Sequence, residues 1–275
     1  MIRVEAFAKI NLSLSVLGRR ADSFHDLDSL VQTIDLADGI TVRLEGVGIR
    51  VNSDLRDLRG RDLAEVAAER ILHEKASSVG VSIAIKKRIP VGAGLGGGSS
   101  DAAAVLVSLD RIVRPRLAYP KLERLAATIG SDVPLFLRGG LLRMTGRGEV
   151  LHAVGQRRLE RFVLLVPPVH CDTSEVYQRF DDLGSGRWGG AGLGENDLLG
   201  AALSVNPALA EYHDAVETIG AQYAGMSGSG ASFFAAFSDW TLAGEAEAVL
   251  RARFPEATVL ACSATGEGQR IIEEG

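Results

Sequence analysis

A glycine-rich stretch at residues 90–101 constrains the fold of this chain more than any other feature of the sequence. It reads Pro-Val-Gly-Ala-Gly-Leu-Gly-Gly-Gly-Ser-Ser-Asp, and five of the seven residues from Gly92 to Gly98 are glycine. A backbone so rich in glycine can adopt left-handed conformations and approach a ligand closely. Alternating apolar residues over 81–85 predict a strand before the stretch. The nearly continuous apolar run over 102–113 predicts a buried helix after it.

This arrangement predicts an anion site at the start of a helix. Ser99, Ser100 and Asp101 are candidate N-caps, and the unpaired N–H groups of a first helical turn attract phosphate. A plain surface turn is the alternative. A Gly-x-Gly-x-x-Gly pattern begins at residue 92, but the acidic residue that a dinucleotide site needs about 20 residues later is missing. No Gly-Lys-Ser or Gly-Lys-Thr occurs, so the stretch is a phosphate loop of a third kind.

Six further motifs follow in a fixed order around this loop. They are Ala8-Lys9-Ile10-Asn11-Leu12, Phe24-His25, Gly130-Ser131-Asp132-Val133-Pro134, Gly146-Arg147-Gly148-Glu149, Asn196-Asp197-Leu198 and Met226-Ser227-Gly228-Ser229-Gly230. Together they resemble the superfamily named for galactokinase, homoserine kinase, mevalonate kinase and phosphomevalonate kinase. The closest resemblance is to its branch that phosphorylates an alcohol with a cytidine diphosphate handle in the non-mevalonate route to isoprenoid precursors.

The resemblance implies an α+β kinase of two domains with the active site between them. We expect an N-terminal ATP-binding domain over residues 1–155 and a C-terminal domain over 156–275, because the composition changes at Gly155-Gln156-Arg157-Arg158. ATP and Mg²⁺ are the implied cofactors, and Ser100 is a candidate ligand for the metal. The implied ATP-binding residues are Lys87, Pro90, Val91, Gly92, Ala93, Gly94, Leu95, Gly96, Gly97, Gly98, Ser99 and Ser100.

Lys9 and Asp132 are the implied catalytic pair. From the residues alone, alternation over Val4–Val16 predicts a strand whose apolar face is buried, with Lys9 on the opposite face. A lysine there is usually solvated, and an aspartate before an apolar pair is usually an N-cap. Lys87, before the glycine loop, has the same alternative as a solvated lysine at a strand end. The resemblance instead makes Asp132 the base and Lys9 the residue that balances its charge.

The implied substrate-binding residues are Asn11, Phe24, His25, Thr173 and Tyr177. The related kinases usually have Gly-Tyr-His where this chain has Ser23-Phe24-His25, so a base can still stack but a tyrosine hydroxyl is lost. They tend to have Asn-Leu where this chain has Asp62-Leu63, which changes a contact near adenine. From the residues alone, Phe24 could equally be a core anchor and His25 a surface residue. Residues 226–230 predict either a hairpin turn or a second backbone cradle near the phosphates.

Composition excludes several other classes of function. The net charge is −5, which argues against binding nucleic acid, and no apolar run approaches the 18 residues that suggest a membrane span. Cys171 and Cys262 alone cannot form a metal cluster or a disulfide scaffold, so we expect a cytoplasmic protein. The only predicted partner is the small-molecule substrate, and the oligomeric state stays open. The alternatives are a sister kinase for homoserine or mevalonate, and an inactive nucleotide sensor, which the intact Lys9, Asp132 and glycine loop disfavour.

Overall fold

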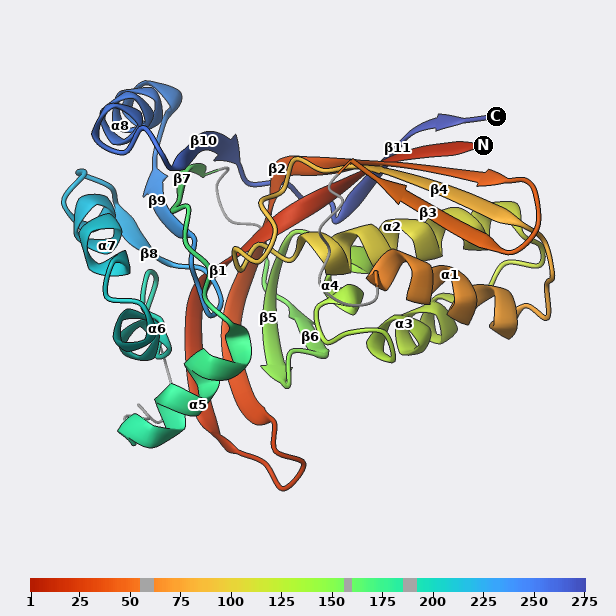
Figure 1. Cartoon of the computed structure of the whole chain (residues 1–275), viewed down its shortest axis with the longest axis horizontal. Coiled ribbons are helices and arrows are strands. Elements are labelled where there is room, and N and C mark those ends of the chain that lie inside the picture. Colours follow the sequence, from red (N-terminus) through yellow and green to blue (C-terminus); the bar gives the residue numbers. More distant parts are fainter. Residues whose placement is uncertain (55–61, 156–159, 185–191) are drawn as a thin grey trace.

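The structure is a computed structural model that describes residues 1–54, 62–155, 160–184 and 192–275. Figure 1 shows two sheets, each with its own group of helices, joined by two long neighbouring strands. The predicted junction at residues 156–158 and most of the glycine-rich segment at 184–194 lie outside the described residues. No helix in the described part of the chain is both long and apolar enough to cross a membrane.

The first sheet is built on a long antiparallel pair, β1 (Ile2–Arg19) and β2 (His25–Leu44). Its strand order is β11-β1-β2-β4-β3, and β5 and β6 extend it from β2. β3 and β4 are parallel and the other pairs are antiparallel. The remaining bounds are β3 (Ile49–Ser53), β4 (Val81–Lys86), β5 (Leu141–Gly146), β6 (Val150–Ala153) and β11 (Gln269–Glu274). The strands predicted over 4–16 and 81–85 are confirmed.

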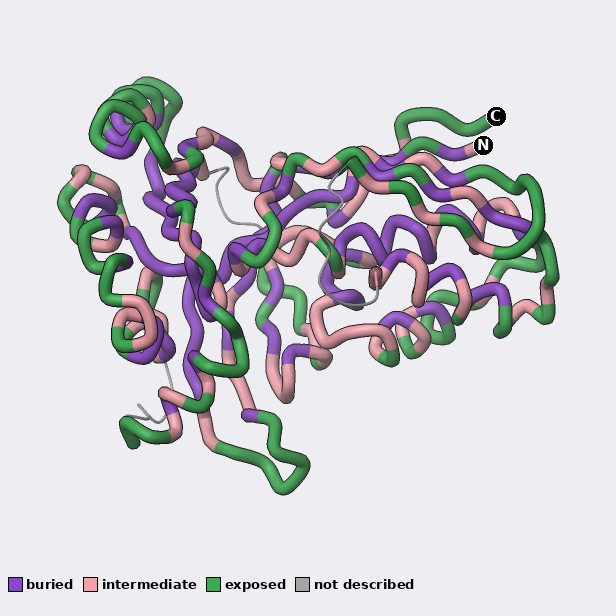
Figure 2. Tube along the Cα trace, in the orientation of Figure 1, coloured by how far each residue is buried: buried purple, intermediate pink, exposed green. Residues whose placement is uncertain are grey.

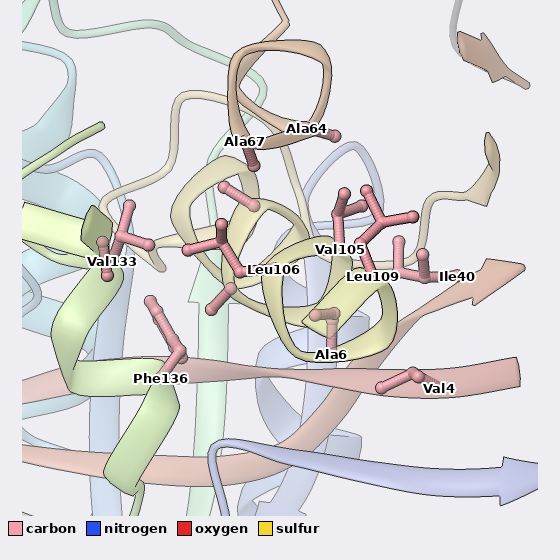
Figure 3. Close-up of a cluster of buried hydrophobic side chains, with 14 of the residues drawn as sticks. Val4, Ala6, Ile40, Ala64, Ala67, Val105, Leu106, Leu109, Val133 and Phe136 are labelled. Atoms are coloured by element: carbon pink, nitrogen blue, oxygen red, sulfur yellow. The ribbon is translucent and has the colours of Figure 1, made fainter. Parts of the chain in front are cut away.

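Four helices pack on one face of this sheet, and the most buried of them follows the glycine loop. They are α1 (Leu63–Glu74), α2 (Gly97–Ile112), α3 (Tyr119–Ala127) and α4 (Val133–Arg138). Figure 3 shows Val105, Leu106 and Leu109 of α2 between α1, β1 and α4. Burying a side chain such as Leu106 completely contributes about 1.5–3 kcal/mol. The hydrophobic core therefore fixes the position of α2, and with it the position of the loop.

The start of α2 differs from the prediction. The helix begins at Gly97, and its N-cap is Gly96, whose φ of 74° is left-handed. Ser99, Ser100 and Asp101 consequently lie inside the first turn instead of capping it. Glycine is the residue that adopts this φ without strain, so the chain can enter the helix three residues earlier than a cap at Ser99 would allow.

The second sheet has the strand order β10-β7-β9-β8 and is antiparallel throughout. Its strands are β7 (Arg161–Val166), β8 (Tyr223–Met226), β9 (Phe233–Phe237) and β10 (Thr258–Ser263), and its helices are α5 (Thr173–Leu183), α6 (Leu199–Val205), α7 (Leu209–Glu217) and α8 (Trp240–Arg253). A separate hydrophobic core joins this sheet to its helices.

The two halves are tied together by the ends of the chain and by β1. Figure 1 shows β11 beside β1, so that both termini lie at one edge of the first sheet. Ile2 and Val4 of β1 pack in the first core, whereas Leu14 and Val16 pack in the second. Figure 2 shows β1 buried along most of its length and exposed at the tip that leads to β2. The division at residue 155 remains a prediction, but the final strand belongs to the N-terminal sheet.

Candidate active site

Three adjoining cavities lie along the line where the two halves meet. The loop cavity, of about 640 Å³, is lined by the glycine loop. The central cavity, of about 220 Å³, contains Lys9 and Asp132, and the aromatic cavity, of about 450 Å³, contains Phe24 and His25. Thr173, at the start of α5, lines all three. The glycine loop and residues from five of the six other motifs thus line adjoining cavities.

The loop cavity collects nearly every residue that the resemblance assigns to ATP. Lys87 and residues 90–99 all line it, and the first turn of α2 forms one wall. The main-chain N–H of Lys9 donates to the carbonyl of Leu95 at 3.0 Å, which fixes the loop against β1. Ser100 is the exception: it is fully buried and does not line this cavity. Backbone amides at a helix start, facing a cavity of this size, are suited to binding phosphate.

The hairpin between β8 and β9 holds the glycine loop from the other side. The Ser227 hydroxyl donates to the carbonyl of Gly94 at 3.0 Å, and the N–H of Ser232 donates to the carbonyl of Ala93 at 3.3 Å. The hairpin turn predicted at residues 226–230 is confirmed, since β8 and β9 pair directly. Gly228 and Ser229 also line the central cavity. The role of this turn as a backbone cradle for phosphates stays a prediction.

Gly94 is the point of closest approach between the loop and this hairpin, and we predict that Gly94→Ala disrupts both. Gly94 has a φ of +76°, and a Cβ there would lie 2.3 Å from the carbonyl oxygen of Ser227. A left-handed alanine costs about 1–2 kcal/mol, and overpacking costs about 1–3 kcal/mol more. Thermal unfolding and ATP calorimetry should show a less stable protein with at least tenfold weaker ATP binding.

Gly98→Ala is the matched control for that substitution. Its added Cβ would meet only Leu63, at 3.9 Å, and the residue is helical. Alanine is favoured over glycine in a helix by about 0.5–1 kcal/mol, so its melting temperature should be equal to that of the wild type or higher. Equal stability of the two variants would contradict the proposed contact at Gly94.

The Asn196-Asp197-Leu198 motif supports the same hairpin. The side-chain amide of Asn196 donates to the carbonyls of Met226 and Gly228, both at 2.8 Å. One carboxylate oxygen of Asp197 accepts the N–H of Val16 at 2.9 Å. The motif therefore joins the end of β1 to the hairpin and lies outside the cavities that contain the predicted site residues.

Lys87 is held behind the glycine loop by two buried carboxylates. Its Nζ lies 2.5 Å from Asp38 Oδ2 and 2.7 Å from Asp101 Oδ2. The other oxygen of Asp38 accepts the N–H groups of Arg88 and Ile89 at 2.5 and 2.9 Å. Burial raises the pKa of Asp101 to about 7, although the Lys87 ammonium acts in the opposite direction. With its side chain 6% exposed, Lys87 is not the solvated residue of the alternative interpretation, and it anchors both ends of the loop.

In the central cavity, Lys9 faces Asp132. Lys9 Nζ lies 3.9 Å from Asp132 Oδ2 and donates a hydrogen bond to the side-chain oxygen of Asn11. The amide nitrogen of Asn11 donates to the Ser29 hydroxyl at 2.8 Å. Lys9 is only 5% exposed, so the solvated alternative is wrong. It is buried because the glycine loop and the hairpin cover the face of β1 that carries it. Burial lowers the pKa of Lys9, and the Asp132 carboxylate offsets part of this shift.

Asp132 occupies the N-cap position of α4 but does not cap it. Its side chain accepts no hydrogen bond from the first turn of that helix. The carboxylate instead lines the central cavity with its side chain 31% exposed. Burial and the nearby Asp132 charge together raise the pKa of Tyr177, so the tyrosine remains a phenol at neutral pH. A carboxylate placed in a cavity opposite a buried ammonium is suited to accepting a proton from a hydroxyl group.

The first helix of the C-terminal half supplies one wall of the site. Asp172 caps α5 by accepting the N–H groups of Ser174 and Glu175 at 2.8 and 3.2 Å. Thr173 can then form a hydrogen bond through Oγ1 with the Ser229 hydroxyl, at 2.9 Å. Thr173 and Tyr177 are four residues apart and line the same cavities, as their spacing predicts.

The aromatic cavity contradicts the alternative interpretation of Phe24 as a core anchor and His25 as a surface residue. His25 stacks on Tyr177, with ring centroids 4.8 Å apart and an interplanar angle of 26°. Its Nε2 lies 2.8 Å from Asp181 Oδ1. Phe24 is 52% exposed and carries the Arg147 guanidinium 5.0 Å above its ring. Phe24 is thus no core anchor and His25, which is 9% exposed, is no surface residue.

Reasoning from the sequence missed four residues of this site: Ser29, Arg147, Asp181 and Ser229. Arg147 and Ser229 lie inside motifs that carried the resemblance, but neither had been given a role. Asp181 follows Tyr177 by one helical turn, so the spacing of Thr173 and Tyr177 could have found it. Ser29 gave no signal, because only the pairing of β1 with β2 brings it beside Asn11.

The Gly-Gly-Gly-Ser-Ser end of the loop carries two serine hydroxyl groups, and the two serines differ in their surroundings. Ser99 lines the loop cavity, and its Oγ would lie 3.9 Å from a Cβ on Gly130, beside the segment that carries Asp132. Ser100 Oγ is buried without a hydrogen-bond partner among the described residues. No group of three His, Cys, Asp or Glu side chains that could hold a metal occurs in those residues.

Comparison with known proteins finds related sequences and structures over most of the chain. The model of the GHMP kinases N terminal domain matches residues 62–140, and that of the GHMP kinases C terminal domain matches residues 178–256. The chain is 37% identical over 254 residues to 4-diphosphocytidyl-2-C-methyl-D-erythritol kinase from Clostridium kluyveri, covering 86% of this chain and 91% of that one. The kinase of the same name from Syntrophomonas wolfei is 42% identical over 182 residues, which are 66% of this chain and 64% of the relative. A crystal structure of 4-(cytidine 5'-diphospho)-2C-methyl-D-erythritol kinase superposes with a TM-score of 0.78 at 32% identity, covering 96% of this chain and 100% of that one.

Proposed function

The chain belongs to the 4-diphosphocytidyl-2-C-methyl-D-erythritol kinases of the GHMP kinase family, and we propose that its three cavities hold ATP and that alcohol in line. It is an ATP-dependent phosphotransferase that acts on the carbon-2 hydroxyl of the alcohol, in non-mevalonate isoprenoid precursor synthesis. One observation supports the proposed geometry above all. The cavity that contains Lys9 and Asp132 shares lining residues with the glycine loop on one side and with an aromatic cavity on the other.

In this proposal the loop cavity binds ATP. The main chain of residues 92–98 and the N-terminus of α2 surround the triphosphate, because a helix N-terminus and its free N–H groups favour negative charge. Lys87 lines the same cavity while it donates to Asp38 and Asp101. Asp62 also lines the cavity and caps α1 by accepting the N–H of Ala64 at 2.8 Å. The γ-phosphate then points toward the central cavity, which shares Gly94 and Gly96 with the loop cavity.

The transfer itself takes place in the central cavity. The oxygen of the carbon-2 hydroxyl group bonds to the γ-phosphorus, and Asp132 accepts the proton that this hydroxyl group loses. The bond from that phosphorus to the β,γ-bridging oxygen breaks, and ADP leaves with the electron pair. Lys9, 3.9 Å from Asp132, balances the charge of the carboxylate and of the transferring phosphoryl group. Phosphoryl transfer depends mostly on positioning and on electrostatic stabilisation of this kind.

The residues present fit a Mg²⁺ ion that would take most of its ligands from the phosphates of ATP and few from the protein. The ion usually keeps one or two protein oxygens and takes the rest of its ligands from phosphate and water. We assign Ser99 as the hydroxyl that faces it, since Ser99 lines the loop cavity and Ser100 does not. When bound, the ion would neutralise charge on the β- and γ-phosphates.

The aromatic cavity holds the cytidine diphosphate handle in this proposal. Phe24 and the His25–Tyr177 stack both line it, and stacking of a base on an aromatic ring contributes about 1–3 kcal/mol. Arg147 lines both this cavity and the central one, so its guanidinium is placed to meet the diphosphate between the base and the alcohol. The alcohol then reaches Asn11 and Asp132.

A cytoplasmic location remains a prediction from composition.

A transfer assay over a panel of alcohols tests this function. Purified protein with ATP should phosphorylate the cytidine compound, with the product phosphate on carbon 2 in a ³¹P spectrum. Homoserine and mevalonate should be poor acceptors, because neither carries a base to fill the aromatic cavity. Transfer to either of them at a rate similar to that of the cytidine compound would contradict the proposal.

A further inference from the structure

His25 meets the aromatic cavity with one ring nitrogen engaged and the other free. Nε2 lies 2.8 Å from Asp181 Oδ1. In the described part of the chain, Nδ1 has no hydrogen-bond partner. It is not one of the fully buried polar atoms that lack a partner, so it remains accessible. His25 and Asp181 both line the cavity. Nδ1 is therefore the ring atom that can form a hydrogen bond with a ligand.

Three further contacts fix the imidazole and its carboxylate partner. Tyr177 stacks on one face of the ring, and the Phe180 ring meets it edge-on with centroids 6.4 Å apart. The second oxygen of Asp181 lies 3.4 Å from Arg19 Nη1. Because Tyr177, Phe180 and Asp181 all belong to α5, a single helix sets both the plane of the ring and the hydrogen bond to Nε2.

We propose that Asp181 is a positioning residue that selects cytosine over uracil through His25. A carboxylate only accepts hydrogen bonds, so the proton of the neutral imidazole must be on Nε2. Nδ1 then presents a lone pair to the cavity. Cytosine carries an amino group, a donor, at the position where uracil carries a carbonyl oxygen, an acceptor. The lone pair accepts from the amino group of cytosine and repels the carbonyl oxygen of uracil.

This inference rests on the proposed function. It explains how the site can distinguish cytosine from uracil, which stacking on Tyr177 and Phe24 cannot do. Every base has an aromatic face, so stacking does not distinguish cytosine from uracil. A hydrogen bond to the base edge does distinguish them, because the wrong base leaves a polar group unpaired. Asp181 does not touch the base in this arrangement. It acts only by fixing which nitrogen of His25 holds the proton.

Asp181→Asn tests the proposal, with Asp182→Asn as the matched control. An asparagine can either accept from Nε2 or donate to it, so the variant keeps the size of the side chain but no longer fixes the proton. Asp182 is exposed, and among the described residues its side chain accepts a hydrogen bond only from Gln178, at 3.1 Å. Its substitution therefore removes the same charge from the same helix without touching His25. Both variants and the wild type are assayed with the cytidine substrate and its uridine analogue.

The wild type should prefer the cytidine substrate, and Asp181→Asn should reduce that preference by about tenfold. The loss should appear as a higher KM for the cytidine compound with kcat nearly unchanged, because Lys9 and Asp132 lie in the neighbouring cavity. Asp182→Asn should retain the wild-type ratio. An unchanged ratio in Asp181→Asn overturns the inference alone. Absence of transfer to the cytidine compound by the wild type would instead overturn the proposed function.

The proton on His25 can also be observed without turnover. In ¹⁵N spectra at pH 8, assigned by comparison with His25→Gln, the wild type should show a protonated Nε2 and an unprotonated Nδ1. Asp181→Asn should show a mixture of the two tautomers. A proton on Nδ1 in the wild type would overturn the proposal, whatever the kinetic result.

Discussion

Asp132→Asn should lower kcat by about 10²–10⁴-fold while the protein still binds ATP. The substitution keeps the shape of the side chain but removes both the base and the negative charge opposite Lys9, 3.9 Å away. ATP binding should change little, because Asp132 lines the central cavity and not the loop cavity. Steady-state transfer to the cytidine substrate gives kcat, and calorimetry gives the affinity for ATP.

The fold should tolerate this change, since Asp132 forms no capping bond with α4. Asp214→Asn is a suitable control, because Asp214 is on α7 and its side chain is 75% exposed. Both variants should melt within a few degrees of the wild type. Near-normal turnover by Asp132→Asn would remove Asp132 from the chemistry, and a large loss of stability would restore a capping role.

Lys9→Met should lower kcat by about 10²–10³-fold without lowering thermal stability. Loss of one preorganised charge next to a reacting group typically has a kinetic effect of that size. Methionine fills similar space without a charge, and the remaining Asp132 carboxylate still reaches solvent through the cavity. Lys86→Met, at an exposed lysine on β4, controls for the change in side chain and should retain full activity.

The pKa of Lys9 also sets how stability and activity depend on pH. Because burial lowers that pKa below its unfolded value, the unfolded chain binds more protons in the window between the two. The stability linked to this group is therefore present above the unfolded pKa and is lost as pH falls through the folded value. Activity has the opposite dependence, since the ammonium is needed. The alkaline limb of the wild-type pH–rate profile should be absent from Lys9→Met, and a melting temperature well below that of the wild type would contradict this account.

Local physical rules account for the parts of the fold that could be predicted. The strand–glycine–helix order around residues 81–112 follows from alternation, from the freedom of glycine and from a continuous apolar run, all of which act within a few residues. The exact start of α2 did not follow, because the left-handed Gly96 competes with the serines as a cap. Local preference can favour two starts, and packing of α2 against β1 selects one of them.

Lys9 and Asp132, the proposed catalytic pair, show most clearly what local sequence patterns can predict and what they cannot. Alternation correctly placed Lys9 opposite the apolar side chains of its strand, but a strand pattern cannot show what covers each face. The covering residues are distant in sequence: Leu95 of the glycine loop follows Lys9 by 86 positions, and Ser227 of the hairpin follows Asn11 by 216. Only the resemblance, which summarises such contacts in related chains, indicated that Lys9 functions with Asp132.

The sequence by itself determined the glycine loop, the buried helix behind it and the residue types available for chemistry, because backbone freedom and hydrophobic periodicity are local properties. The tertiary structure alone decided that Lys9 is buried, that Asp132 leaves its helix uncapped, and that Asp181 engages His25 instead of solvent. The protonation and hydrogen bonding of those groups depend on burial and on neighbours that are distant in sequence. These conditions exist only after β1 has joined the two sheets.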